Sequence, residues 1–415
     1  SSSASDQITL GHTNQSVRIS SSYTLPTVDG SANQVLQTDG SGALSFATVS
    51  GGGGADLYAA NESSPNAQPS ATGANAIAIG DRAVASAEDA LGVGTDTDAT
   101  GTATAAFGKG AQATANYSLS LGLNTIASAE RAIGIGNNGV VAGSTYSTAI
   151  GHNSGFGGSV TATGSGAMAL GGSYASGTNS LAAAIATNSS SYGATAQQSV
   201  SIGYNTKATG TNSVAIGLLA QATNSNALAM MRGVASGQTS IAIGYEASAS
   251  AKNSVAIGRY AKSETQGKYA FSNSDTWGQG KAQSGHFILK SDTTDATAEA
   301  LTTNRTTADA TNQVVLPNNS VYGFTGTVIA REDSSSTNDF AVWEVKGGAV
   351  RAGSASTTAL GTYNINKISE STGATNWSIA LSADTTNGAV AITVTGEASH
   401  SIRWVATVNT TEVIY

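Results

Sequence analysis

Residues 73–272 repeat one pattern of apolar and polar positions, in which a short apolar segment ends in glycine and small polar residues follow. The first copy, residues 76–80, reads AIAIG, and a late copy, residues 254–258, reads SVAIG. The glycines that close five early copies stand at positions 80, 94, 108, 122 and 136, each 14 residues from the next. A fixed period of this kind predicts one structural unit that is stacked along an axis.

Each repeat is predicted to form a flattened coil of two short strands. In residues 214–216 the period of two places Val and Ile on one side of the strand and Ala on the other. Gly217 ends this strand, because glycine reaches positive φ at low cost, and residues 220–223 form a second, smaller strand. About 14 coils stacked in parallel, at roughly 4.8 Å a step, predict a rod on the order of 65 Å long.

The small residues of the repeat predict that several rods associate. The alanine positions, Ala78 and Ala215 among them, are expected to form the outer apolar face of the coil, where small side chains let a neighbouring wall approach closely. Cyclic association of identical rods would bury this face and contribute roughly 25 cal/mol for each Å² removed from water.

The flanking segments divide the chain into three predicted parts. Residues 1–54 are interpreted as a β-rich adaptor that ends in a glycine linker. Residues 55–272 hold the repeats, which irregular insertions interrupt in residues 152–199. Residues 273–415 hold longer alternating runs separated by turn signals, a pattern typical of an antiparallel β-sandwich or jelly roll. The predicted fold class is therefore all-β.

Composition narrows the classes of function. The 18 basic and 26 acidic residues give a net charge of −8 with no basic run, which argues against nucleic-acid binding. The chain has no cysteine, which excludes a disulfide frame, a thiolate zinc site and a cysteine nucleophile. No segment approaches the ~18 apolar residues of a membrane helix, and we expect no membrane insertion. The first residue is Ser1 and no signal-peptide pattern opens the sequence, which leaves open whether the chain is processed or is a fragment.

One segment of the repeat has a specific resemblance. Residues 199–212, SVSIGYNTKATGTN, resemble the head repeat of YadA-type trimeric adhesins, and such copies cover about half of the chain. The resemblance implies a left-handed parallel β-roll in which three chains lie side by side, and therefore a homotrimer.

The flanks resemble other proteins. Residues 24–40, TLPTVDGSANQVLQTDG, resemble a segment that recurs in phage tail fibres, and residues 318–331, NNSVYGFTGTVIAR, resemble a terminal domain of phage and prophage fibres. A complete adhesin of the YadA type would also need a coiled-coil stalk and outer-membrane strands, and neither pattern follows residue 331. Together the resemblances favour a tail fibre of a bacteriophage that adheres to the host.

This interpretation implies a non-enzymatic structural protein of the virion, located outside the cell. Its expected partners are two further copies of itself, other tail proteins, and a glycan or outer-membrane protein of the host. Two alternatives stay open. One is a bacterial trimeric adhesin or extracellular filament subunit, and the other is a polysaccharide-degrading tailspike.

Motifs that could carry chemistry are weak. Residues 134–139 match the GxGxxG dinucleotide fingerprint, but their glycines follow the 14-residue frame and no helical pattern follows. Asp96 and Asp98 do not recur with the period of calcium-binding rolls. The histidines are dispersed, at His12, His152, His286 and His400. We therefore predict no catalytic residue, no cofactor and no metal.

A glycosidase would need two carboxylates about 5–10 Å apart. The acids of the C-terminal part lie near a turn or alternate along a strand, which disfavours such a pair, and they are Glu332, Asp333, Asp339 and Glu344.

Four aromatic residues are candidate receptor contacts. Phe156, Tyr174 and Tyr192 lie in the irregular insertions, and insertions in a solenoid emerge on its faces, where binding often occurs. The alternative is a decayed repeat. Trp377 lies beside an alternating strand, where a role in the core is the alternative to stacking on a sugar. The sequence leaves open whether residues 152–199 or the C-terminal loops contact the receptor, and which end attaches to the particle.

Overall fold

The computed structural model describes residues 18–19, 23–32, 34–48, 67–152, 159–184, 191–274, 276–333 and 338–415. The chain divides into two compact units, Ser1–Ser63 and Ser64–Tyr415. No helix among the described residues is long and apolar enough to cross a membrane.

The first unit contains two antiparallel strand pairs. β1 (Arg18–Ile19) pairs with β2 (Tyr23–Thr24), and β3 (Gln34–Thr38) pairs with β4 (Leu44–Thr48). The turn between β3 and β4 is closed by Asp39, whose Oδ1 accepts hydrogen bonds from the backbone N–H groups of Ser41 at 2.8 Å and Ala43 at 3.1 Å. Hydrogen bonds from an Asp side chain to the backbone two residues further on are typical of turns.

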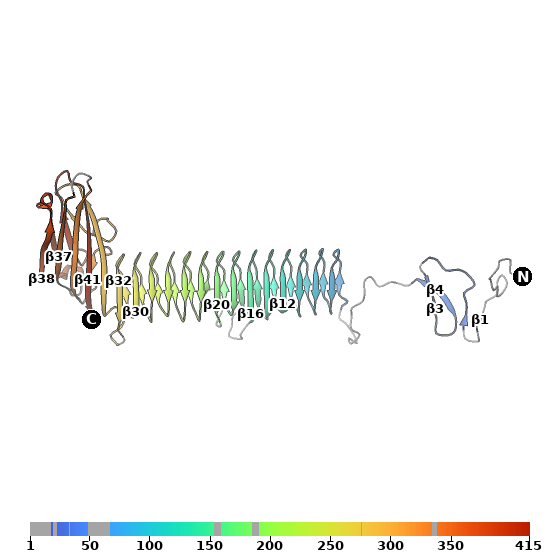
Figure 1. Ribbon diagram of the computed structural model, residues 1–415. Coiled ribbons are helices and arrows are strands. Elements are labelled where there is room, and N and C mark those ends of the chain that lie inside the picture. Colours follow the sequence, from blue (N-terminus) through green and yellow to red (C-terminus); the bar gives the residue numbers. More distant parts are fainter. Residues whose placement is uncertain are drawn as a thin grey trace. The chain divides into compact units, whose positions relative to one another are not determined.

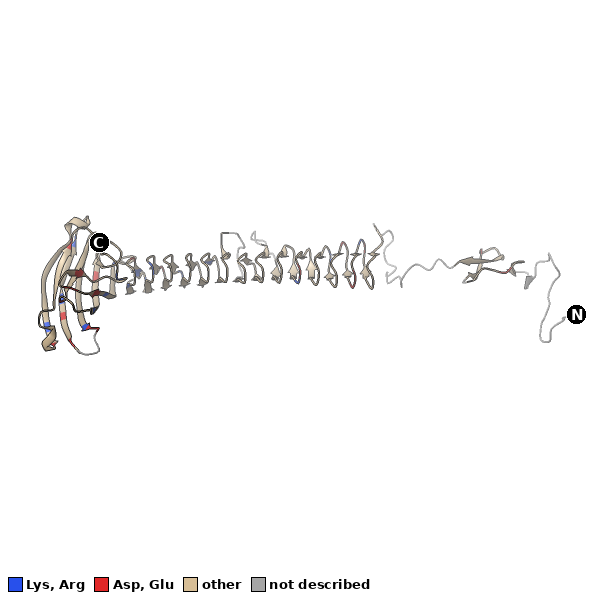
Figure 2. Ribbon diagram, turned by 90° about the horizontal axis from the view of Figure 1, so that it is seen from above, with Lys and Arg blue, Asp and Glu red and all other residues tan. Residues whose placement is uncertain are grey.

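The second unit begins with a β-solenoid, which confirms the stack of flattened coils (Figures 1 and 2). One wall of the solenoid is a parallel sheet of strands of three to five residues. These are β6 (Ile77–Ile79), β8 (Leu91–Val93), β10 (Ala105–Phe107), β12 (Leu119–Leu123), β14 (Ile133–Asn137), β16 (Thr148–His152), β18 (Met168–Gly171), β20 (Leu181–Ala184), β22 (Val200–Ile202), β24 (Val214–Ile216), β26 (Leu228–Met230), β28 (Ile241–Ile243), β30 (Val255–Arg259) and β32 (Tyr269–Asn273).

The opposite wall is a 14-stranded parallel sheet of strands of two or three residues. These are β5 (Ser70–Ala71), β7 (Val84–Ala85), β9 (Asp98–Ala99), β11 (Gln112–Ala113), β13 (Ile126–Ala127), β15 (Val140–Ala142), β17 (Val160–Ala162), β19 (Tyr174–Ala175), β21 (Gly193–Ala194), β23 (Lys207–Ala208), β25 (Gln221–Ala222), β27 (Val234–Ala235), β29 (Ser248–Ala249) and β31 (Lys262–Ser263).

Glycine is required at the corner where each longer strand ends. Gly108 has a φ of +111°, and a Cβ built on it would lie 2.6 Å from the carbonyl oxygen of Gly122 in the next coil. The two coils therefore approach so closely that no side chain fits between their corners. This close approach, together with the positive φ, explains why the glycines recur with the period of the repeat.

The alanines of the coil point inward, so the prediction that they form its outer face is wrong. Ala215 is fully buried, whereas Val214 and Ile216 on the same strand are partly exposed. The buried clusters inside the solenoid consist almost entirely of alanine. The physical reason is the thinness of the coil, because two walls this close leave room only for small side chains. The larger aliphatic residues are left on the outside.

The irregular region predicted at residues 152–199 keeps the register of the ladder. Ile150 pairs with Leu170, 20 residues later, and Leu181 pairs with Val200, 19 residues later. The extra residues lie between β16 and β17 and between β20 and β21. Both insertions therefore leave the solenoid at the same corner, after a longer strand and before a shorter one.

The longer-stranded wall continues into the C-terminal part as one sheet. β33 (Ala282–Thr293) pairs antiparallel with β32 of the last coil. From there the sheet runs through β41 (Ile402–Ile414), β36 (Ser320–Glu332), β37 (Phe340–Arg351) and β38 (Ala359–Glu370). All four of these pairings are antiparallel, in agreement with the predicted change from parallel coils to an antiparallel fold after the repeats.

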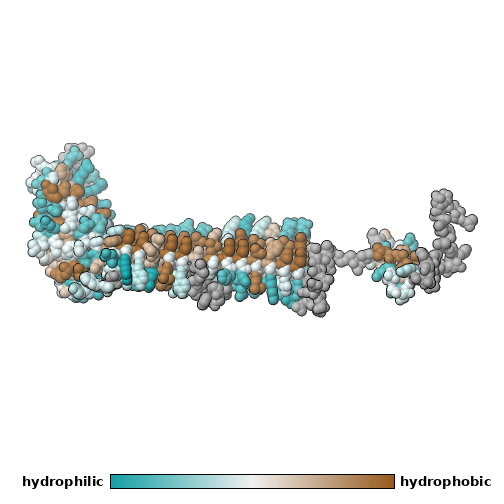
Figure 3. Space-filling model, turned by 60° about the horizontal axis from the view of Figure 1, so that its bottom comes forward, coloured by the Kyte–Doolittle hydropathy of each residue, from teal (hydrophilic) through white to brown (hydrophobic). Residues whose placement is uncertain are grey.

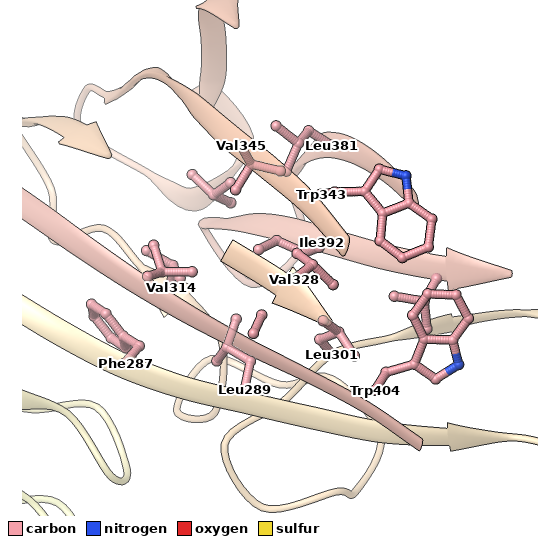
Figure 4. Close-up of a cluster of buried hydrophobic side chains, with 14 of the residues drawn as sticks. Phe287, Leu289, Leu301, Val314, Val328, Trp343, Val345, Leu381, Ile392 and Trp404 are labelled. Carbon is pink, nitrogen blue, oxygen red and sulfur yellow. The ribbon is translucent and has the colours of Figure 1, made fainter. Parts of the chain in front are cut away.

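A second antiparallel sheet packs on this one. It contains β34 (Ala298–Ala300), β35 (Val314–Val315), β39 (Ser378–Asp384) and β40 (Ala389–Thr395). Two short 3₁₀ turns, η1 (Ala355–Thr357) and η2 (Thr372–Ala374), flank β38. The core between the sheets holds large apolar side chains such as Phe287, Leu289 and Ile392 (Figure 4). This part therefore has the bulky core that the solenoid lacks.

A buried ion pair joins the last coil to the C-terminal sheet. Lys268 Nζ donates to Glu412 Oε2, and both side chains are almost fully buried. Gln283 Nε2 donates to the same carboxylate oxygen at 2.7 Å, and the rings of Phe287 and Tyr322 lie within 5.6 Å of the ammonium group. Burial lowers the pKa of Lys268 and raises the pKa of Tyr322.

Candidate binding surfaces

An apolar band runs along the outer face of the longer-stranded wall (Figure 3). It consists of the outward-facing first and third residues of the longer strands, two for each coil, and we call it the aliphatic stripe. Its members are Ile77, Ile79, Leu91, Val93, Ala105, Phe107, Leu119, Leu121, Ile133, Ile135, Thr148, Ile150, Met168, Leu170, Leu181, Ala183, Val200, Ile202, Val214, Ile216, Leu228, Met230, Ile241, Ile243, Val255, Ile257, Tyr269 and Phe271.

The stripe becomes polar where the solenoid ends. The row formed by the first residues of the longer strands ends at Tyr269, which pairs with His286 on β33. Beyond His286 the same row of the sheet holds polar side chains, in the order Asn409, Thr325, Lys346 and Asn364. One continuous sheet therefore has an aliphatic outer face along the coils and a polar row across the C-terminal strands.

A groove of ≈ 1090 Å³ follows this polar row. Gly285, Gly323 and Gly347 contribute to its lining and present no side chain there. His286 Nδ1 lies 2.8 Å from Asn409 Oδ1, which fixes the orientation of both side chains. Since asparagine, threonine, histidine and lysine supply several hydrogen-bonding groups, the groove offers donors and acceptors to a polar ligand or to another protein.

Apolar rows lie on both sides of the polar row. Val413, Val321 and Val350 stand opposite one another on three neighbouring strands and are exposed. On the other side, Val405 and Ile329 form a second exposed pair. Exposed apolar patches of this extent are typical of surfaces that contact another protein.

The four aromatic residues singled out in the sequence do not form one site. Phe156 lies outside the described residues. Tyr174 and Tyr192 line the same small hollow between coils of the solenoid. Trp377 is only 1% exposed, and its ring centroid lies 6.1 Å from that of Trp404 in the core. The structure thus gives Trp377 the core position that was the alternative to contact with a sugar.

Two of the acidic residues considered for hydrolysis, Asp333 and Asp339, have structural partners. Asp339 Oδ1 accepts hydrogen bonds from the Ser371 hydroxyl at 2.6 Å and from the backbone N–H of Gly373 at 3.2 Å. Asp333 lies 3.4 Å from the guanidinium group of Arg403. Within the described ranges, no group of three or more His, Cys, Asp or Glu side chains is arranged to hold a metal ion.

Sequence reasoning missed the groove and its polar row. The groove is lined by β32, β33, β36, β37, β38 and β41, which are spread over more than a hundred residues. Only the alternation of each strand was visible in the sequence, and alternation does not reveal which strands become neighbours.

Parts of the repeat region are similar to a known protein family. Five segments match the family described as the YadA head domain repeat, at residues 71–97, 99–125, 194–220, 208–230 and 235–261. All five lie in the coils. The residues between the second and third matches contain both insertions.

The solved structures that resemble the chain are distant in sequence. No curated protein matches the chain. Among solved structures, the tailspike protein of Acinetobacter phage vB_ApiP_P1 is 15% identical, with a TM-score of 0.22, over 82% of this chain and 58% of that one. The tailspike protein of Acinetobacter baumannii phage AM24 is 10% identical, with a TM-score of 0.17, over 77% of this chain and 57% of that one. The chain therefore spans less than two thirds of either tailspike.

Proposed function

We propose that the chain is a homotrimeric fibre protein of a bacteriophage tail that attaches the virion to the host surface. The observation that carries the proposal is the aliphatic stripe, which lies on the outer face of the coils from Ile77 to Phe271. A regular apolar surface of this length is unstable in water, and identical rods that pack stripe against stripe remove it from water.

The number of rods and the biological setting come from other observations. The matched YadA head repeats support an arrangement of three chains. The resemblance of residues 24–40 and 318–331 to segments of phage fibres favours a virion over a bacterial cell surface. In this proposal, the N-terminal unit contacts other tail proteins, and the C-terminal sheets contact a host glycan or outer-membrane protein. Three copies in one fibre raise the effective concentration of weak contacts.

The C-terminal sheets also have a structural role in the fibre. β33 covers the edge strand β32 of the last coil. An uncovered parallel edge would present unpaired N–H and C=O groups and promote aggregation, so terminal repeats of solenoids need a cap.

The oligomeric state tests the first half of the proposal. Light scattering of the purified chain should give three times the mass of one chain. The double change Ile216→Glu and Ile243→Glu places two charges in the stripe and should give monomers. Gln221→Glu, on the opposite wall, adds a charge without touching the stripe and should remain trimeric. A monomeric unmodified chain would contradict the proposal.

Cell adsorption and polysaccharide degradation test the second half. The purified fibre should compete with virions for adsorption to host cells and should leave host polysaccharide at its original chain length. Shortening of the polysaccharide would favour a degrading tailspike instead. Genes for bacterial secretion rather than virion parts around its own gene would favour a bacterial adhesin or filament subunit.

A further inference from the structure

One corner of the later coils carries large exposed side chains in succession. They follow the end of the longer strand in five neighbouring coils, and we call them the corner ridge: Tyr204, Leu218, Met231, Tyr245 and Arg259. Met231 is 57% exposed and Tyr204 50% exposed. The equivalent corner of the earlier coils holds mainly small or polar residues, namely Asp81, Thr95, Lys109, Leu123, Asn137 and His152.

Arg259 is held in the ridge by aromatic rings. Its guanidinium carbon lies 5.4 Å from the ring centroid of Tyr245 and 5.3 Å from that of Tyr260. These two rings meet edge to face at 5.7 Å. Cation–π contacts of this kind fix the plane of the guanidinium group while leaving its N–H groups free to donate. Among the described residues, no carboxylate pairs with Arg259.

The neighbouring arginine differs in this respect. The guanidinium carbon of Arg232 also lies over Tyr245, 4.5 Å from the ring centroid, and its guanidinium group lies 3.3 Å from Glu246 Oε1. Arg232 therefore already has an anionic partner, whereas Arg259 presents a positive charge without one.

A loop that carries an exposed tryptophan is anchored to the same corner. Gln279 Nε2 donates to the backbone oxygen of Glu246 at 2.6 Å, and the backbone N–H of Gly280 donates to the backbone oxygen of Tyr260 at 2.7 Å. Trp277 in this loop is 61% exposed. An indole at the surface supplies a flat apolar face with one polar N–H, which suits stacking against a sugar ring.

Charge distinguishes this half of the rod from the other. Residues 191–260 contain four basic side chains and one acidic side chain, whereas residues 67–152 contain three basic and six acidic side chains. Charged residues are sparse along all coils (Figure 2), so a small local excess decides the sign of the local field. The corner ridge therefore lies on the positive half of a chain with a net charge of −8.

We infer that the corner ridge binds an acidic polysaccharide, one whose sugars carry carboxylates. Arg259, which Tyr245 and Tyr260 hold in place, pairs with a carboxylate through charge-assisted hydrogen bonds, and the exposed indole of Trp277 supplies a face for a sugar ring. Because the coils repeat at roughly 4.8 Å, a chain molecule that lies along the rod meets several ridge positions in sequence. This inference rests on the proposed role in host attachment and names the class of its ligand.

Binding of polygalacturonate by the purified full-length chain tests the inference, with dextran as the neutral probe. Polygalacturonate should bind, more weakly as salt is raised, and dextran should not. Arg259→Gln should weaken polygalacturonate binding on the order of tenfold, as expected for the loss of about 1.4 kcal/mol. Trp277→Ala should weaken it as well. Lys252→Gln removes the same charge from the opposite corner of that coil and should change binding less than about twofold.

Three results would overturn the inference. The first is that polygalacturonate does not bind, or that it binds the Arg259→Gln protein equally well. The second is that Lys252→Gln weakens polygalacturonate binding as much as Arg259→Gln does, which would mean that the net positive charge of the coils and not the corner ridge attracts the polysaccharide. The third is that Arg259→Gln dissociates the oligomer in light scattering, which would make the ridge a contact between copies. Adsorption of the unmodified fibre to host cells, measured alongside, shows separately whether the proposed attachment role fails.

Discussion

Lys268 Nζ and Glu412 Oε2 lie 2.7 Å apart, although 144 residues separate them in the sequence. Lys268 occupies the position that precedes each longer strand, which holds Ala, Ser or Thr in the other coils. In the last coil no further coil follows, and the lysine extends instead toward the C-terminal sheet. The pair therefore joins the end of the solenoid to its cap at a point that water does not reach.

Removing one partner of this pair should be costly. Glu412→Gln leaves the Lys268 charge buried without a counter-ion, and we expect a loss of about 3–5 kcal/mol in the free energy of unfolding. Denaturant titration measures this loss. The double change Lys268→Met and Glu412→Leu should recover most of it, because it removes both charges. A double variant that is no more stable than Glu412→Gln would contradict this account.

The stability of the Glu412→Gln variant should depend on pH. Burial lowers the pKa of Lys268 from 10.5, so the folded protein releases this proton more readily than the unfolded chain does. Between the lowered pKa and 10.5 the unfolded chain binds more protons, and stability therefore rises with pH in that window. The deficit of Glu412→Gln relative to the unmodified protein should narrow as the pH approaches 10.5. A deficit that stays constant across this range would count against the buried charge as its cause.

Gly108 should not tolerate alanine. The added Cβ would lie 2.6 Å from the oxygen of Gly122, and the φ of +111° is strained for any side chain. We expect Gly108→Ala to lower the free energy of unfolding by at least ~1–3 kcal/mol. Gly353→Ala is the matched control, because a Cβ there meets no atom within 4 Å. Equal stability of the two variants in thermal unfolding would refute the close approach of the corners.

Ala215 and Ile216 are neighbours in sequence with opposite roles. Ala215→Leu should disrupt folding of the coil, at a cost of about 1–3 kcal/mol or more, because the interior has no room for the larger side chain. Ile216→Ala should leave the fold of the single chain intact and weaken association between chains. Circular dichroism reports the first effect and sedimentation at decreasing concentration the second. If Ala215→Leu weakened only association and Ile216→Ala disrupted the fold, alanine would form the outer face of the coil, as the sequence analysis predicted.

The indole N–H of Trp404 depends on a single hydroxyl, that of Thr293, which accepts its hydrogen bond at 2.9 Å. Thr293→Val keeps the shape but leaves the buried donor unsatisfied, and should cost about 1–3 kcal/mol. Thr293→Ser retains the hydroxyl and should cost much less. Denaturation followed by tryptophan fluorescence compares the two variants, which would be equally stable if the hydrogen bond contributed nothing.

The sequence was sufficient to predict the coils but not which of their faces points inward. A period of two separates Val214 and Ile216 from Ala215, yet it does not say which side is buried. The thickness of the coil decides which side points inward, and the repeats contain a pattern that indicates it. The alanine position also holds Gly92 and Ser120 but never a large side chain, whereas the flanking positions vary in size. Restriction to small residues marks the crowded side.

Contacts between distant parts of the chain could not be predicted. Lys268 in the last coil reads as one more polar residue until β41 brings Glu412 to it. In the same way, His286 and Asn409 become neighbours only because β33 pairs with β41. The alternation of each strand specifies its two faces, and the order of strands in the sheet then depends on packing of the complete C-terminal core.

The two insertions at residues 152–199 change the length of the chain without changing the ladder, since Ile150 still pairs with Leu170 and Leu181 with Val200. The segments inserted at this corner can therefore be exchanged for other sequences while the strands of the neighbouring coils keep their pairing partners. Loops of another length or sequence can be substituted there with no compensating change elsewhere in the rod. The same corner is a natural position for an engineered peptide tag.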